Sequence, residues 1–473
     1  MKRGDELDLT IESVALEGKG VARADGMVVF VRGGVSGDEV RSRVWKTKKR
    51  FVEAETIAVL SPSPLRTTPR CRFFGVCGGC TWQHVHYAAQ LEFKRQHVID
   101  TLERIGGFKG VAVNEVLGSE DSYYYRNKME FSFGDRWLQQ SEHESRPDRP
   151  PEDRFALGLH IPDRFDKVLD IDECWLQSEA SAGIVNLVRT FCAERRLSVY
   201  STFTHTGYLR NLVIREGKRS GDRMVNLVTS EERPEIVDAL CARLLAAYPT
   251  LTTFVNNITR RKSQVAVGET EKVWHGPGYI TEKIGSRTYR ISSNSFFQTN
   301  TAQAERLYDV ARTMAKLSAD ATVFDLYSGA GTIALHVAGG VAGVVGVESV
   351  ESAVEDARRN AAFNGVANCT FLLGDLKDRL TKEKEWLAHH PHPDVIIVDP
   401  PRAGMHERVV QEILALRPGR IVYVSCNPAT QARDLKLLCG PGAYGLEEVQ
   451  PVDMFPHTSH VEVVASLGLR SPR

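Results

Sequence analysis

The 473-residue sequence lacks long apolar runs and any excess of charge. No window approaches the roughly 18 consecutive apolar residues of a membrane-spanning helix. The opening residues, MKRGDELDLT, are charged and lack the apolar core of a secretory signal. We therefore expect a cytoplasmic, monomeric protein with no membrane partner. Because 60 Lys and Arg balance 60 Asp and Glu, binding to a polyanion would require local basic clusters.

The front half of the chain predicts a small β-domain followed by a mixed α+β region. Residues 5–60 form short alternating runs punctuated by glycine, which is typical of a β-barrel. A proline-containing linker, SPSPLRTTPR, follows, and residues 85–105 have the apolar spacing of a helix that Gly106 and Gly107 should end. Further on we expect helices at 177–195 and 233–246, a polar surface loop at 135–155, and strands at KMEFSFG, FALGLHI, LVIREG, MVNLVTS and SQVAVG.

From about residue 300 the pattern changes to alternating strands and helices. The predicted strands lie in TVFDLYSGAG, GVVGVE, CTFLLGD, DVIIVDPP and RIVYVSC, before a final hairpin. This alternation predicts an α/β, Rossmann-like domain with a doubly wound, largely parallel sheet.

The ends of the first three of these strands predict a nucleoside-binding site. The glycine-rich turn DLYSGAGT (325–332) follows the first strand, Glu348 ends the second and Asp375 follows the third. A carboxylate at Glu348 can pair with both ribose hydroxyls, and Asp375 can meet an adenine amino group. The GxGxxG fingerprint of a pyrophosphate site is absent, because Ala334 stands at its last position. S-adenosylmethionine therefore fits better than a dinucleotide, although Glu348 could instead only cap the following helix.

The next two strand ends predict a reaction centre at the same edge of the sheet. Asp399 closes one strand and Cys426 follows the other. A lone cysteine is commonly an inert core residue, but beside a methyl donor it is a candidate nucleophile. Thiolate addition to carbon 6 of a pyrimidine makes carbon 5 nucleophilic, and a base must later remove the carbon 5 proton. Glu462 is the candidate for that base, with Asp399 as a second carboxylate.

Together these residues resemble the bacterial RNA uracil-C5 methyltransferases, which make 5-methyluridine in tRNA and 23S rRNA. The resemblance covers essentially the whole chain and rests on NSFFQTN (294–300), DLYSGAGT, GVE, DPPRAG (399–404), VSCNPAT (424–430) and FPHTSHVE (455–462). It implies that Cys426 is the nucleophile and Glu462 the proton acceptor. It also implies that Gln298, Tyr327, Glu348 and Asp399 contact S-adenosylmethionine, while Asp375 rests on its strand-end position.

The resemblance also assigns the front of the chain. Residues 1–60 resemble a TRAM domain, an RNA-binding module, which makes the basic run RSRVWKTKKR (41–50) a candidate RNA surface; a solvated strand and loop is the alternative. The segment 124–128 (YYRNK) is typical of the family and could either stack on RNA or be buried. We expect the remaining domains to be a central one (61–84 and 118–285) and the methyltransferase domain (85–117 and 286–473).

Four cysteines predict a metal centre. Cys71, Cys77 and Cys80 lie within ten residues, and Cys174 is the best fourth ligand. Spacing alone leaves zinc and iron–sulfur open. Family members with this arrangement carry a [4Fe–4S] cluster, so the resemblance implies one in the central domain, with a structural role.

The expected activity is therefore methylation of a uridine carbon 5 in RNA, with 23S rRNA as the first candidate substrate and tRNA as the alternative. Methylation of a cytosine or an exocyclic amine is a second reading, but amine methylation needs no thiol. A third reading is an RNA-binding or iron–sulfur protein with a vestigial methyltransferase fold, which the intact candidate residues disfavour.

Overall fold

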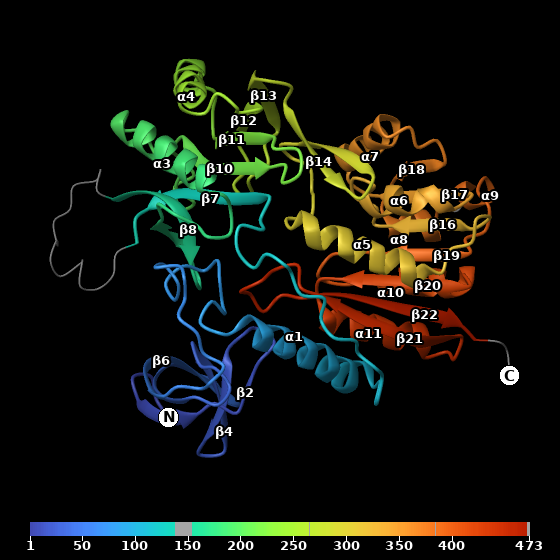
Figure 1. Cartoon of the computed structure of the whole chain (residues 1–473), viewed down its shortest axis with the longest axis horizontal. Coiled ribbons are helices and arrows are strands. Elements are labelled where there is room, and N and C mark those ends of the chain that lie inside the picture. Colours follow the sequence, from blue (N-terminus) through green and yellow to red (C-terminus); the bar gives the residue numbers. More distant parts are fainter. Residues whose placement is uncertain (138–153, 264, 384, 471–473) are drawn as a thin grey trace.

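The computed structural model describes residues 1–137, 154–263, 265–383 and 385–470. It has three groups of elements (Figure 1): an N-terminal sheet at the lower left, a central sheet above it, and a C-terminal α/β unit on the right. In the described part of the chain, no helix is long and apolar enough to cross a membrane.

The N-terminal group is a six-stranded sheet in the order β1-β5-β6-β4-β3-β2. Inward apolar side chains alternate with outward polar ones along β5, so one face forms a small core and the other meets solvent. The strands are β1 (Glu6–Thr10), β2 (Ser13–Val14), β3 (Gly20–Ala24), β4 (Met27–Arg32), β5 (Glu39–Thr47) and β6 (Phe51–Ser61).

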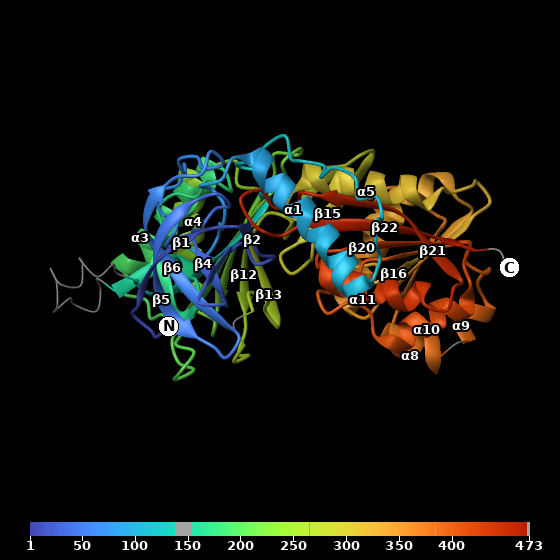
Figure 2. The same ribbon diagram turned by 90° about the horizontal axis from the view of Figure 1, so that it is seen from below.

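Helix α1 (Tyr87–Thr101) leaves the N-terminal group and packs against the C-terminal one (Figure 2). It continues into one π-helical turn, η1 (Leu102–Gly106), and ends where Gly107 adopts a left-handed φ of 76°. This confirms the helix and the glycine stop expected from the sequence.

The central group is a seven-stranded mixed sheet in the order β13-β12-β11-β10-β7-β8-β9. Helices α3 and α4 share a hydrophobic core with it. Its elements are β7 (Lys128–Asp135), β8 (Phe155–Ile161), β9 (Arg164–Asp170), α3 (Glu179–Glu194), β10 (Leu209–Glu216), β11 (Arg223–Thr229), α4 (Pro234–Ala247), β12 (Thr253–Ile258) and β13 (Thr270–His275).

One strand expected in this region is wrong. The described residues of SQVAVG (263–268) form no strand, because Ala266 packs against Val213 and Val228 on the face of the sheet. The Ser263 carbonyl also accepts a hydrogen bond from Arg210. Strands β9, β12 and β13 were not anticipated, and most of the surface loop expected at 135–155 lies outside the described residues.

The C-terminal group confirms the expected doubly wound sheet. The strand order is β18-β17-β16-β19-β20-β22-β21, with only β22 antiparallel to its neighbours. The strands are β16 (Thr322–Leu326), β17 (Gly343–Glu348), β18 (Cys369–Leu373), β19 (Val395–Val398), β20 (Arg420–Ser425), β21 (Tyr444–Val452) and β22 (Glu462–Leu469).

Alternate side chains of these strands point into two separate cores, one on each face. Helices α5, α6 and α7 cover one face, and α1, α8, α10 and α11 cover the other. The remaining elements are β14 (Tyr279–Ile284), β15 (Arg287–Ser292), α5 (Thr301–Ala315), α6 (Thr332–Val337), η3 (Ala338–Gly340), α7 (Glu351–Phe363), α8 (Leu376–Thr381), α9 (Glu385–Ala388), α10 (Glu407–Leu416) and α11 (Pro428–Cys439).

Candidate active site

Three of the predicted cofactor residues line one pocket at the carboxyl ends of β16, β17 and β18. Tyr327, Glu348 and Asp375 surround it together with Pro401, Gly404 and His406 from the loop after β19. A parallel sheet binds ligands at this edge, where the strand order reverses between β16 and β19. The pocket therefore lies where the sequence placed the nucleoside.

Glu348 contacts the backbone at the start of α7 and also lines the pocket. Its carboxylate accepts hydrogen bonds from Ser349 N at 2.7 Å and Val350 N at 2.9 Å, which satisfies the backbone at the entry to α7. The other oxygen accepts Gly329 N at 3.0 Å and so orders the glycine-rich turn. The residue thus organises the pocket while still lining it.

The floor beneath this pocket is acidic. Asp325, near the end of β16, is buried, and Asp399, directly after the neighbouring strand β19, is half-buried. Burial together with the Asp399 carboxylate raises the pKa of Asp325 to about 7. Asp325 Oδ2 accepts Ala334 N at 2.9 Å, while Oδ1 has no hydrogen-bond partner among the described residues. In their ionised form these carboxylates favour a cationic ligand such as a sulfonium, and such a ligand would in turn favour their ionisation.

Gln298, the fifth predicted cofactor residue, lies in the segment before α5 and outside the walls of this pocket. Its carbonyl accepts Asn127 Nδ2 at 2.8 Å, and Thr299 O accepts Asn127 N. The central sheet therefore fixes the NSFFQTN segment against the C-terminal group.

The predicted nucleophile and base are brought together by strand pairing. Ser425, the last residue of β20, pairs with Val463 of β22. Cys426 therefore follows one strand next to the point where Glu462 begins the other. Glu462 is 3% exposed, whereas Cys426 is half-buried and open to an incoming ligand.

The electrostatics of this pair oppose ionisation. Burial raises the pKa of the Cys426 thiol to about 11, and the carboxylates of Glu462 and Asp399 act in the same direction. Burial and the Asp399 carboxylate raise the pKa of Glu462 above its ordinary range. Groups poised in this way are typical of sites that move protons.

Arg402 is a functional candidate that sequence reasoning missed. Its guanidinium lowers the pKa of both Cys426 and Glu462, against the effect of burial. The available signal was a cation within DPPRAG, directly after the acidic strand end. Arg402 is thus the cation that can favour the thiolate form of Cys426.

The four predicted cluster cysteines come together from two segments. Cys71, Cys77, Cys80 and Cys174 line one pocket of the central group, beside Phe73, Phe74 and Trp175. N–H groups point at two of the sulfurs: Gly79 N to Cys77 Sγ at 3.4 Å and Gln83 Nε2 to Cys80 Sγ at 3.2 Å. Among the described residues, no three His, Cys, Asp or Glu side chains converge on one metal ion.

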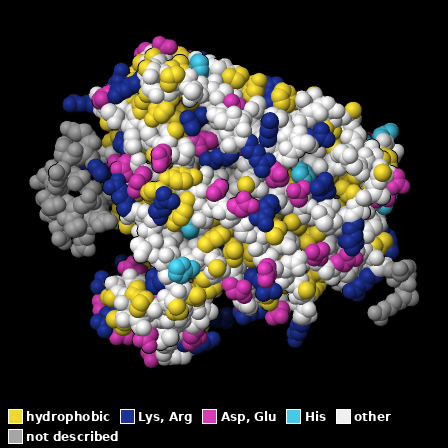
Figure 3. Space-filling model, viewed as in Figure 1, with side chains coloured by type: hydrophobic (Ala, Val, Ile, Leu, Met, Phe, Trp, Pro, Cys, Tyr) yellow, Lys and Arg dark blue, Asp and Glu magenta, His cyan; other side chains and the backbone are white. Residues whose placement is uncertain are grey.

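The basic run 41–50 is partly neutralised. Arg41 binds Asp8 at 2.8 Å and Arg43 binds Glu6 at 3.0 Å across the strands. Lys48, Lys49 and Arg50 are exposed at the turn between β5 and β6. On the face shown in Figure 3, Lys and Arg side chains are intermixed with acidic ones.

The YYRNK segment divides between the core and a second pocket. Tyr125 is buried and donates to Pro456 O at 3.2 Å. Arg126 and Lys128 line a polar pocket whose other walls come from the cysteine loop, Thr299 and the segment before β22. This pocket therefore lies between the cysteine loop, the central group and the segment that leads into the start of β22.

Comparison with known proteins matches the whole chain. Residues 254–468 match the family model described as tRNA (Uracil-5-)-methyltransferase, and residues 1–57 match the TRAM domain. The chain is 47% identical to an uncharacterized RNA methyltransferase of Chlorobaculum tepidum, over 98% of this chain and 96% of that protein. A similar protein of Porphyromonas gingivalis is 43% identical, over 97% and 99% of the two chains.

Among solved structures, the chain is similar to the Pyrococcus abyssi tRNA (uracil-54, C5)-methyltransferase in complex with S-adenosyl-L-homocysteine. The TM-score is 0.74 at 33% identity, over 98% of this chain and 100% of that one.

The sheet order and its acidic ligand pocket define the class of S-adenosylmethionine-dependent methyltransferases. Within that class, the chain belongs to the RNA (uracil-5)-methyltransferase family and carries an N-terminal TRAM domain. It is an enzyme that binds RNA and methylates carbon 5 of uracil.

Proposed function

We propose that the enzyme methylates a uridine of 23S rRNA through a covalent bond between Cys426 and carbon 6 of the base. The observation that carries the covalent route is the pairing of β20 with β22, which sets Cys426 beside Glu462 and within the electrostatic influence of Asp399. The bound S-adenosylmethionine supplies an activated methyl group. The chain's own residues supply the nucleophile, the base and the acidic floor.

The proposed sequence begins at the sulfur of Cys426. Arg402 favours the thiolate, which adds to carbon 6 while the electrons of the C5–C6 double bond move toward the carbonyl at carbon 4. After carbon 5 has gained the methyl group, Glu462 accepts the carbon 5 proton. The released electron pair reforms the C5–C6 double bond, and the Cys426 thiolate leaves.

The nature of the RNA is tested by direct methylation. Purified enzyme is supplied with labelled methyl donor and with 23S rRNA or tRNA from a strain that lacks it. We expect label in rRNA, and nuclease mapping should place it on discrete uridines. The Pyrococcus abyssi protein is named as a tRNA enzyme, which makes tRNA the second candidate; label confined to tRNA would overturn the rRNA assignment.

We also propose that Cys71, Cys77, Cys80 and Cys174 hold a [4Fe–4S] cluster. Each of its four irons takes one thiolate, so the ligands surround a volume instead of converging on one ion. The four thiols fit this because they line a single pocket, with N–H groups directed at two of them. The expected role is to join the linker after β6 to the central group.

The cluster proposal is tested by anaerobic purification. The protein should be brown and contain about four irons and four sulfides per chain, and Cys174→Ser should lose most of both. The matched variant Cys192→Ser changes a cysteine buried in α3 and should keep them. A colourless protein with one zinc would overturn the proposal.

We propose that Tyr327, Glu348, Asp375, Asp399 and Gln298 bind the methyl donor, and Glu348 offers the sharpest test. Glu348→Gln should weaken S-adenosylhomocysteine binding by about ten- to a hundredfold, because a hydrogen bond to a charged group contributes roughly 1.5–3 kcal/mol. Calorimetric titration measures this. Glu351→Gln, in the first turn of α7, should bind as the parent does, and an unchanged affinity for Glu348→Gln would contradict the assignment.

The pH dependence of steady-state turnover should reveal the raised pKa values, because full turnover requires both thiolate addition and proton removal. Both Cys426 and Glu462 must be deprotonated to act, and the pKa of each is raised by burial. The rate should therefore increase as pH rises through neutrality. Arg402→Gln removes the cation that lowers both pKa values and should move this limb to higher pH. Exposed Arg408→Gln should leave it in place, and an unmoved limb in Arg402→Gln would refute the role of that cation.

A further inference from the structure

The loop that carries the chain into Glu462 is held by groups that the reaction does not use. Residues 453–461 connect β21 to β22, and the last pair of that ladder is Val452 with Glu462. The loop is therefore closed at its base by the proposed proton acceptor. Any change in the path of the loop would change how Glu462 enters the site.

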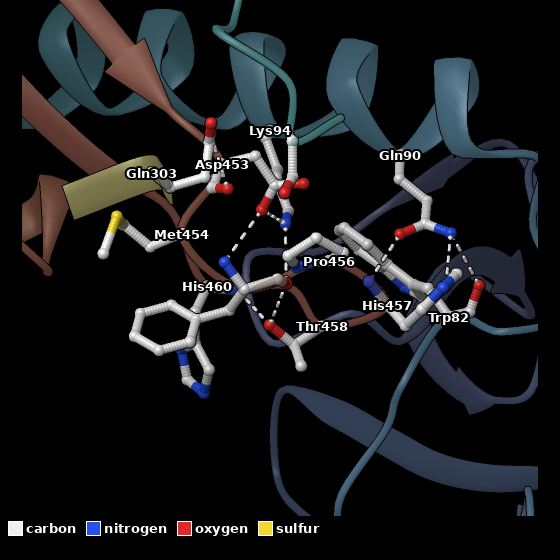
Figure 4. Close-up of polar contacts among 12 residues, drawn as sticks. Trp82, Gln90, Lys94, Gln303, Asp453, Met454, Pro456, His457, Thr458 and His460 are labelled. Carbon is white, nitrogen blue, oxygen red and sulfur yellow. Dashed lines mark hydrogen bonds and ion pairs between the residues drawn. The ribbon is translucent and has the colours of Figure 1, made fainter. Parts of the chain in front are cut away.

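A buried ion pair fixes the first part of this loop (Figure 4). Lys94 Nζ on α1 donates to Asp453 Oδ1 at 2.5 Å and to Phe455 O at 3.1 Å. Both charged side chains are 0% exposed. Tyr87, about two turns earlier on α1, donates to Asp453 Oδ2 at 2.8 Å. The carboxylate of Asp453 is thus held at both oxygens by one helix.

A buried amide fixes the second part. Gln90 Oε1 accepts His457 N at 2.9 Å, and its Nε2 lies 3.2 Å from His457 Nδ1. His457 has a left-handed φ of 65°, a strained conformation for a residue with a side chain. Its carbonyl accepts Thr81 N and Trp82 N. The turn is therefore held by α1 and by the end of the cysteine loop.

The contacts continue along the loop toward Glu462. Thr458 Oγ1 donates to Phe455 O at 2.8 Å, and His460 N donates to Thr458 Oγ1 at 3.3 Å. Phe455 O is the same carbonyl that Lys94 binds. A short chain of hydrogen bonds thus leads from the Lys94 ammonium to the residue two positions before Glu462 (Figure 4).

Stability alone does not account for the pair. Removing two charges from water costs about as much as their attraction returns, and apolar side chains of similar volume often replace such pairs without loss. What an ion pair adds is a fixed geometry between a helix and a loop that are 359 residues apart in sequence.

We propose that Lys94 is a positioning residue for proton removal, acting through Asp453 and the 453–461 loop to hold Glu462 in register with Cys426. This inference rests on the proposed role of Glu462 as proton acceptor. It predicts that loss of Lys94 slows the step after methyl transfer and spares binding. The methylated covalent adduct should then accumulate, because removal of the carbon 5 proton has become slow.

The test uses the full-length holoenzyme with unmodified RNA and S-adenosylmethionine. Lys94→Met keeps the length of the side chain and removes its charge. We expect kcat to fall at least tenfold while KM for RNA and the affinity for S-adenosylhomocysteine stay within twofold. A denaturation-resistant RNA–protein adduct containing 5-methyluracil should accumulate during turnover. Exposed Lys109→Met, just beyond α1, is the matched control and should behave as the parent does.

Two further variants separate positioning from misfolding. Asp453→Asn keeps the shape of the loop residue and should give the same adduct, and it carries the test if Lys94→Met does not fold. Lys94→Met added to Glu462→Gln should cause no further loss, because both act on one step. A fall in kcat without adduct, an unchanged kcat, or equal loss of cofactor binding would overturn the proposal. If Glu462→Gln itself yields no adduct, the proton acceptor is wrong; if only Lys94→Met and Asp453→Asn yield none, the positioning is wrong.

Discussion

Cys426→Ala should abolish methyl transfer to RNA, with a loss of at least about 10⁴-fold, as for other enzymes that lose a catalytic nucleophile. Without the sulfur, carbon 5 of uracil cannot become nucleophilic, and the remaining groups only bind. The measurement is transfer of labelled methyl under single-turnover conditions, together with trapping by RNA that contains 5-fluorouridine. Fluorine cannot leave as a cation, so the parent enzyme should stay covalently bound and the variant should not.

Two control results are expected for this prediction. Cys439→Ala alters a half-buried thiol at the end of α11 and should retain activity and trapping. Cys426→Ala should still bind S-adenosylhomocysteine, because Cys426 lies outside the Tyr327–Glu348 pocket and is not one of the proposed cofactor-binding residues. Substantial methyl transfer by Cys426→Ala would exclude the thiol mechanism.

Glu462→Gln should reduce turnover by about 10²–10⁴-fold, the usual contribution of a positioned base. The amide keeps the shape of the buried side chain but cannot accept the carbon 5 proton. Because addition of Cys426 and methyl transfer precede that step, the variant should accumulate as a covalent adduct with unmodified RNA. Gel electrophoresis under denaturing conditions, followed by mass spectrometry of the linked nucleotide, measures this directly.

The neighbouring acid provides the control for the second prediction. Asp399→Asn alters a carboxylate that the mechanism assigns to the floor of the site, and it should weaken cofactor binding without accumulating adduct. If Asp399→Asn accumulates the adduct and Glu462→Gln does not, the two carboxylates must exchange roles.

The C-terminal sheet could be predicted from the sequence because each of its strands and turns is marked by residues that are close together in the chain. A buried strand followed by DLYSGAGT, and acids at the ends of successive strands, specify where a parallel sheet places its ligand. The same rule predicted that Cys426 and Asp399, which follow neighbouring strands, lie at one edge of the sheet. The role of Glu462 came from the need for a base and from the family resemblance, whereas the pairing of β22 with β20 that places it beside Cys426 was seen only in the structure.

What escaped prediction depends on contacts between distant segments. SQVAVG has the alternation of a strand, but Ala266 is used to cover Val213 and Val228. No sequence periodicity marked Arg402 as a functional residue. Its effect on the pKa of Cys426 depends on the pairing of β19 with β20, which brings the two residues together. Lys94 lies in a helix whose apolar spacing gave no reason to bury an ammonium, and its partner Asp453 is far along the chain.

That separation has a consequence for how the enzyme is made. The 359 residues between Lys94 and Asp453 take about 20–70 s to synthesise at ordinary translation rates. Helix α1 must wait through that time with its ammonium in water, because its counter-ion and the last strands do not yet exist. The reaction site is then completed within the final few dozen residues, so a nascent chain can display its TRAM domain to RNA well before it can modify any.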